Sequence, residues 1–127
     1  MITKQHIVAL GAAGILAAAS PLVAHHSWPV DCSTPITVTG TVLGYTWANP
    51  HVMIGLEVTA DDGTTENWTV GGPSLRRMAE NAWDRDTLQP GDVITGTGHR
   101  FLDGSNVVKL AKLVMADGEE MVLYDNC

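Results

Sequence analysis

The chain has 127 residues, enough for one domain of ordinary size and no second one beside it. Apolar residues make up 45% and charged residues 17%, a composition typical of a globular protein and not of a disordered one. Seven Lys and Arg against 14 Asp and Glu give a net charge of −7 without a basic stripe, so nucleic acids and anionic membrane surfaces are not expected partners.

The first 24 residues have the layout of a secretory signal peptide. A basic end with Lys4 precedes the apolar run 7–19, and the small residue Ala24 follows at a suitable cleavage position. A helix over this run is only about 20 Å long, too short to span a bilayer. The sequence therefore predicts that residues 1–24 are cleaved, that the mature chain starts at His25 in the periplasm or outside the cell, and that it keeps no membrane span.

Alternating apolar and polar residues predict β-strands after an extended N-terminal arm over residues 25–35. The first strand is expected from Ile36 onward, and its alternation changes parity at Gly44, where a bulge or bend is expected. Further strands are expected over residues 52–58, 66–70, 93–98, 107–115 and 121–124.

One segment between the third and fourth predicted strands has a helical period instead. After the N-cap candidate Ser74, apolar side chains recur at Leu75, Met78, Ala79, Ala82 and Trp83. Three strands, a short helix and two or three further strands are typical of a small OB-like barrel. We therefore expect a mainly β domain over residues 36–127, a closed or partly open OB-like β-barrel of five to six strands. The alternative is a β-sandwich, which would need no helix.

The two cysteines, Cys32 and Cys127, form an even pair in a chain predicted to be exported, which favours one disulfide. A loop of this size stabilises the fold by about 4–5 kcal/mol in the chain-entropy model. The bond would tie the N-terminal arm to the C-terminus. The alternative is a redox or metal-ligating pair, which no CxxC motif supports.

Seven short motifs are spread over the predicted mature chain. They are His-His-Ser at 25–27, Thr-Trp-Ala-Asn-Pro-His-Val at 46–52, Asn-Trp-Thr-Val at 67–70, Arg-Asp-Thr-Leu at 85–88, Pro-Gly-Asp at 90–92, Gly-His at 98–99 and Asp-Gly-Ser at 103–105. Together they resemble a family of small exported bacterial proteins described only as a domain of unknown function. The resemblance implies an exported β-barrel-like domain and supplies no reaction or ligand. The cysteine pair departs from the family's pattern, so the disulfide is a local addition.

Four histidines remain after the predicted cleavage and form the candidate metal site: His25, His26, His51 and His99. Cleavage would give His25 a free α-amine, so that its amine and imidazole nitrogens chelate one ion. Such nitrogen ligands suit copper best, and zinc or nickel less. Met53 shares a predicted strand face with His51 and would add a thioether suited to Cu(I). The alternative is that these histidines hydrogen-bond backbone groups at turns and strand ends.

Ser74, Arg76 and Arg77 form a weaker candidate site, for an anion at the start of the predicted helix. The alternative is an ordinary strand-to-helix connection with solvated arginines. Catalytic motifs are absent from the sequence, so no enzymatic activity is expected. The sequence thus predicts an exported binding module that takes a metal ion, copper before zinc. The alternative is a structural or interaction module that binds an unknown protein partner without metal or catalysis.

Overall fold

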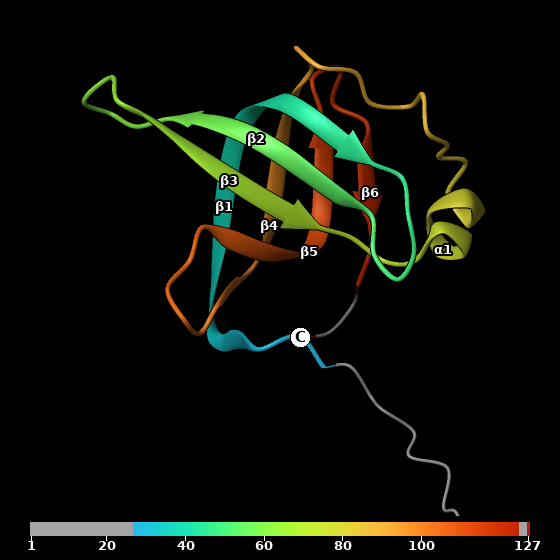
Figure 1. The fold of residues 1–127 in the computed structure, drawn as a ribbon, viewed down its shortest axis with the longest axis horizontal. Helices are drawn as coiled ribbons and strands as arrows, with labels where there is room; N and C mark the ends of the chain where they lie inside the picture. Colours follow the sequence, from blue (N-terminus) through green and yellow to red (C-terminus); the bar gives the residue numbers. More distant parts are fainter. Residues whose placement is uncertain (1–26, 125–126) are drawn as a thin grey trace, which may run out of the picture.

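A computed structural model describes residues 27–124 and 127 of the chain (Figure 1). Its elements in chain order are β1 (Val30–Thr46), β2 (Met53–Thr59), β3 (Thr65–Gly71), α1 (Leu75–Glu80), β4 (Val93–Phe101), β5 (Val107–Met115) and β6 (Glu120–Val122). The fold is mainly β, with one short helix between the third and fourth strands. The predicted fold class is confirmed.

Five of the strands form a closed ring. The sheet order is β3-β2-β1-β4-β5-β6, and a parallel pairing between β3 and β5 joins the two sides. The long strand β1 pairs with β4 along its first part and with β2 along its second, so it belongs to both halves of the ring. Figure 1 shows β1 bending around the ring to do so. The small strand β6 extends the sheet beyond β5.

The bend in β1 lies where the sequence changes parity. The register between β1 and β2 shifts between Val42 and Gly44, and the prediction of a bulge at Gly44 is confirmed. Val42 before the shift is buried, and Tyr45, three positions later, packs against the core. A continuous alternation would have carried the wrong face of the second half of β1 into the core.

The inward faces of the strands enclose a single apolar core. Its buried members are Val38, Val42, Val52, Ile54, Leu56, Val70, Met78, Trp83, Leu88, Ile94, Val108, Leu110, Leu113, Met121 and Leu123. The helix α1 contributes Met78 to this core and lies on the side where β1 ends and β2 begins (Figure 1).

The helix is shorter than its periodicity predicts. It ends at Glu80, and Ala82 has a positive φ of 61°, which a continuing helix does not allow. Trp83 is nevertheless buried, and its backbone N–H donates to the carbonyl of Met78 at 3.1 Å. The predicted extension through Ala82 and Trp83 is therefore wrong, because a turn and not a further helical turn brings the indole to the core.

Three strand boundaries differ from the predicted ones by more than one residue. β4 continues to Phe101, beyond the predicted end at residue 98. β1 begins at Val30, which pairs with Phe101 of β4, so the end of the segment expected as an arm over residues 25–35 is already strand. The last strand covers Glu120–Val122 and not residues 121–124. The described residues include no helix with the length and apolarity that a membrane crossing requires. The predicted signal peptide over residues 1–24 lies outside the described residues.

Candidate functional site

Trp28 is the centre of an aromatic cluster where the N-terminal segment meets the ring. Its ring centroid lies 4.4 Å from that of His51 and 5.7 Å from that of Phe101. The N–H of Leu102 donates to the carbonyl of Pro29 at 2.9 Å, which fixes the segment against the end of β4. The indole is therefore held over His51 by backbone contacts on its C-terminal side.

Gly71, at the end of β3, leaves room for this indole. Because Val70 before it points into the core, Gly71 faces outward. A Cβ on Gly71 would stand 2.8 Å from Cζ3 of Trp28 and 3.1 Å from Sδ of Met53. Met53 is the cross-strand partner of Gly71. The indole and the thioether therefore cover the same glycine, and His51 lies two residues before Met53 in the chain.

His51 is oriented through one ring nitrogen. Its Nδ1 lies 3.2 Å from the carbonyl oxygen of Gly72. A carbonyl only accepts, so Nδ1 carries the proton, and in a neutral imidazole Nε2 keeps its lone pair. The N–H of Gly72 donates to the carbonyl of Val52 at 2.8 Å, which fixes the acceptor in turn. The ring thus makes the backbone hydrogen bond that the alternative prediction describes and keeps a second nitrogen that can bind a metal.

The other predicted metal ligands have a different setting. His99 is part of β4, where it pairs with Pro35 of β1 and Lys109 of β5. His25 and His26 lie outside the described residues. Within residues 27–124 and 127, no group of three or more His, Cys, Asp or Glu side chains could hold a metal ion. The structure therefore brings His51 and Met53 together around Trp28 and gives His99 other neighbours.

Cys32 and Cys127 form a disulfide, with their Cα atoms 5.7 Å apart, as the sequence predicts. Beside this bond lies Lys109, the one buried polar or charged residue of the described part. Its Nζ donates to the backbone oxygen of Cys127 at 2.7 Å and lies 4.5 Å from the ring centroid of Tyr124. Burial raises the pKa of Tyr124, and a hydrogen bond with Trp28 partly offsets this. Sequence reasoning missed Lys109, because one lysine in a strand is usually solvated.

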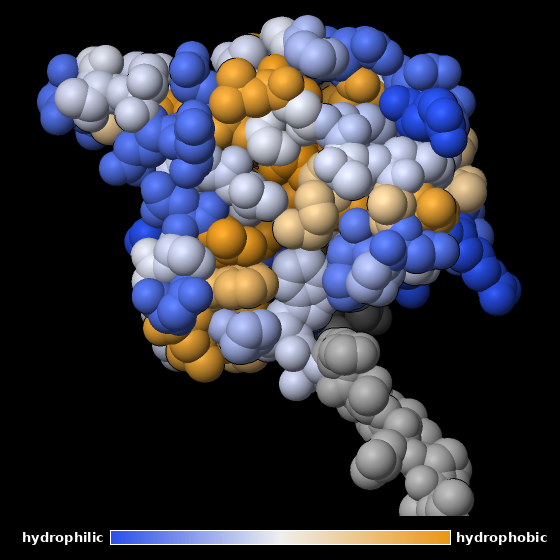
Figure 2. Space-filling model, in the orientation of Figure 1, coloured by the Kyte–Doolittle hydropathy of each residue, from blue (hydrophilic) through white to orange (hydrophobic). Residues whose placement is uncertain are grey.

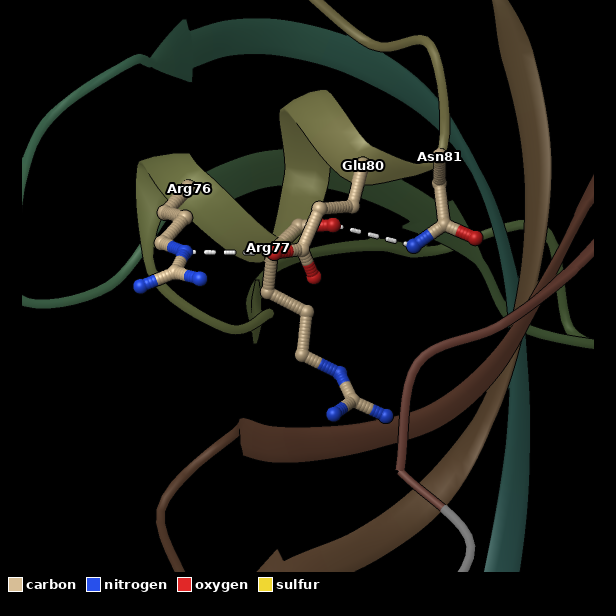
Figure 3. A network of polar contacts seen from close by, with 4 residues as sticks. All are labelled: Arg76, Arg77, Glu80 and Asn81. Atoms are coloured by element: carbon tan, nitrogen blue, oxygen red, sulfur yellow. Dashed lines mark hydrogen bonds and ion pairs between the residues drawn. The ribbon is translucent and has the colours of Figure 1, made fainter.

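The residues of the weak candidate anion site contact other parts of the protein. Nε of Arg76 lies 3.2 Å from Oε1 of Glu80, and Nε of Arg77 donates to the carbonyl of Leu123 at 3.2 Å. Figure 3 shows the two guanidinium groups pointing apart. The side chain of Ser74 makes no capping hydrogen bond to α1. These contacts favour the alternative prediction of an ordinary strand-to-helix connection.

A second residue that sequence reasoning missed is Arg100, which fixes the β4–β5 hairpin. Its guanidinium lies 5.0 Å from the ring centroid of Trp68. Nε donates to the carbonyl of Ser105 at 2.8 Å, and Nη2 donates to the carbonyl of Gly104 at 2.6 Å and to Oδ1 of Asn106 at 2.7 Å. The hairpin motif around Gly104 therefore has a structural role. No pocket is found in the part of the chain that the structure describes.

The fold and this cluster define a small, mainly β domain with a closed ring of five strands and a His–Met–Trp group on its outside. The protein belongs to a family of unknown function (DUF6152), which matches residues 12–109, and the predicted membership of a domain-of-unknown-function family is confirmed. A comparison with curated proteins gives no match. Among solved structures, the crystal structure of the TiaS-tRNA(Ile2)-ATP complex is similar to this protein, with 16% sequence identity and a TM-score of 0.46. The match covers 71% of this chain and 20% of that chain. The chain thus spans about a fifth of that protein's length.

Proposed function

We propose that this protein is an exported, periplasmic binding module that takes a copper ion through its histidines. The observation that carries the proposal is the hydrogen bond from Nδ1 of His51 to the carbonyl of Gly72, at 3.2 Å. Metal-binding histidines almost always donate their second ring nitrogen to such a partner, which fixes the tautomer and directs the other nitrogen to the ion. Copper is favoured over zinc because nitrogen-rich sites bind it more tightly.

His25 supplies the chelating half of the proposed site. Cleavage after Ala24 frees its α-amine, and the amine and imidazole then bind the same ion, with His26 next to them. Trp28 follows three residues later and lies 4.4 Å from His51. Three extended residues span at most about 10 Å, so this tether keeps His25 within reach of an ion on His51.

The cysteine pair supports the export part of the proposal. Disulfides persist in oxidising compartments and are rare in the cytosol. The 5.7 Å separation of the Cα atoms of Cys32 and Cys127 is compatible with such a compartment.

The experiment uses protein purified from the periplasm with its native N-terminus. Its intact mass should correspond to a chain that begins at His25, and a mass that retains Lys4 would contradict export with cleavage. Calorimetric titration should show one Cu(II) ion per chain. We expect His51→Ala to weaken binding about tenfold or more. One extra residue before His25 should weaken it comparably, because it moves the α-amine away from the imidazole.

The matched control is His99→Ala, which removes an imidazole that has other neighbours in β4. It should leave the copper affinity within about twofold if His51 is the ligand. If it causes the larger loss, His99 and not His51 completes the site. Equal affinity in the wild-type protein, the extended protein and His51→Ala would contradict the proposal as a whole.

A specific observation also favours the second candidate, an interaction module without metal. Leu43 and Val93 are 50% and 45% exposed. They lie on the adjacent strands β1 and β4, near the pair that Thr41 forms with Val93. Figure 2 shows apolar patches between polar regions on the face drawn. If the native protein takes up no copper, a partner in the cell envelope that is lost with Leu43→Ser and Val93→Ser would establish this second function.

A further inference from the structure

We propose that the group around Trp28 is a Cu(I) subsite, in which Nε2 of His51 and Sδ of Met53 bind the ion and the face of the Trp28 indole covers it. This inference rests on the proposed function for His51. It goes further in naming the oxidation state, the second ligand and the aromatic cover, and it requires neither His25 nor its α-amine.

The chemistry of the three groups selects a soft cation of low charge. A thioether is a neutral, polarizable ligand that binds Cu(I) and has little affinity for harder divalent ions. Imidazole binds both oxidation states of copper. An indole face attracts a cation through its ring quadrupole, and tryptophan does so more strongly than the other aromatic side chains. Together these groups favour Cu(I) over Cu(II) and zinc.

The geometry of the group is fixed before any ion binds. Met53 is set opposite Gly71 by the β2–β3 register, and His51 is set by its hydrogen bond to Gly72. The Trp28 ring rests where a side chain at position 71 would otherwise stand. Gly71 and Gly72 thus position the indole, the thioether and the imidazole, and no loop has to close to bring the three groups into one neighbourhood.

The charge next to the group acts in the same direction. Lys109 is paired with Gly71 in the parallel contact between β5 and β3. Its ammonium is buried beside Tyr124 and Cys127, and it is the charged side chain adjoining Gly71 on the side opposite Met53. Coulomb repulsion scales with the charge of the ion, so this ammonium disfavours a divalent ion twice as strongly as a monovalent one. The cation beside the group thus adds to its preference for Cu(I).

The test separates this subsite from the N-terminal chelate. The mature chain is prepared with one extra residue before His25, which removes the amine chelation. Cu(I) is kept reduced with ascorbate, which spares the disulfide, and its affinity is measured by competition with bathocuproine disulfonate. We expect one Cu(I) per chain. Met53→Leu should weaken binding about tenfold or more, whereas Zn(II) binding should not change.

Matched variants distinguish a ligand from a packing residue. Met115→Leu changes a partly buried methionine at the far end of β5 and should leave the Cu(I) affinity unchanged. X-ray absorption of the Cu(I) form should show a Cu–S distance that is lost in Met53→Leu and kept in Met115→Leu. Trp28→Phe should weaken Cu(I) binding, and Trp47→Phe should not, because Trp47 contacts Tyr45.

A glycine pair tests the aromatic cover without changing any ligand. In Gly71→Ala the new methyl group meets the Trp28 ring and Sδ of Met53, so the indole must move and Cu(I) affinity should fall. Gly55→Ala is the control, because the nearest atoms to its methyl group would be 3.9 Å away. Thermal unfolding of each variant separates a local loss from a loss of the fold.

The possible failures can be told apart. Unchanged Cu(I) affinity and an unchanged copper spectrum in Met53→Leu and Trp28→Phe would overturn the Cu(I) subsite, while Cu(II) binding at the N-terminus would stand. A Cu(I) site that survives the N-terminal extension, in a protein whose Cu(II) affinity does not respond to that extension, would overturn the chelate only. If His51→Ala changes neither affinity, both proposals are wrong.

Discussion

The ammonium of Lys109 donates a 2.7 Å hydrogen bond to the backbone oxygen of Cys127, 18 residues further along the chain. Lys109 is only 7% exposed, and a buried cation destabilises a fold unless acceptors surround it. Cys127 supplies one acceptor and the ring face of Tyr124 another. Because Cys127 is in turn bonded to Cys32 in β1, the disulfide keeps the acceptor beside the lysine. The covalent bond and the buried charge are therefore coupled.

This coupling predicts how the two lysines of β5 react with an amine-acylating reagent. In the oxidised protein we expect Lys109 to react much more slowly than Lys112, whose side chain is 41% exposed. Reduction of the disulfide should release Cys127 and bring the rate at Lys109 towards that at Lys112, which serves as the internal control. Peptide mass spectrometry measures both sites in one sample. Equal rates in the oxidised protein would show that Lys109 is not held as described.

Removal of the disulfide should destabilise the protein strongly. The bond joins residues 95 positions apart, and a loop of that length contributes about 4–5 kcal/mol to the free energy of unfolding in the chain-entropy model. We expect the double variant Cys32→Ser with Cys127→Ser to lose about this amount in urea unfolding. Wild-type protein unfolded under reducing conditions is the control and should match the variant. An unchanged midpoint for either would contradict the prediction.

The two tyrosines of the chain should both ionise at a higher pH than a free tyrosine does. Burial, and to a smaller extent the carboxylate of Asp84, raises the pKa of Tyr45 above the ordinary value of 10.0. Its hydroxyl also donates to the carbonyl of Asp84 at 3.2 Å. Burial likewise raises the pKa of Tyr124. Ultraviolet titration of folded protein should therefore show less tyrosinate near pH 10 than the same titration of protein in urea.

The same shift has a defined effect on stability. Because the folded pKa lies above the unfolded one, the contribution to stability is complete below the unfolded pKa and is lost as the pH rises through the folded pKa. The free energy of unfolding should therefore decrease with pH from about pH 10 upward. Tyr45→Phe should reduce this dependence, and a wild-type slope in that variant would contradict the assignment to Tyr45.

A pair of glycine substitutions tests how closely the strands approach. In Gly98→Ala the new methyl group would collide with the carbonyl group of Lys109, whose carbon lies 2.9 Å from the Cβ position. Backbone atoms cannot give way, so we expect a loss of about 2 kcal/mol or more in the free energy of unfolding. Gly44→Ala is the control, since nothing lies within 4 Å of its Cβ position. Equal urea midpoints for the two variants would contradict this account.

The sequence by itself determined the order of the elements, the parity change at Gly44 and the disulfide. Alternation and turn residues are local signals, because a side chain's direction follows from the strand's own period of two. The same local signals misplaced the end of α1. The apolar spacing continues through Ala82 and Trp83, but the helix does not. Ala82 has a left-handed backbone conformation, and the turn that it makes places Trp83 in the core.

The sequence also predicted that His51 and Met53 share a strand face, a relation between neighbours in the chain. In the structure β2 begins at Met53, and His51 lies just before it. The tertiary structure decided what surrounds them. Trp28 covers Gly71 and lies against His51 only because the closed ring brings the N-terminal segment past the end of β3. Lys109 contacts Tyr124 and the backbone oxygen of Cys127, which the disulfide joins to Cys32 in β1. These contacts join positions far apart in the chain, so their formation depends on strand register and ring closure, which no local period encodes.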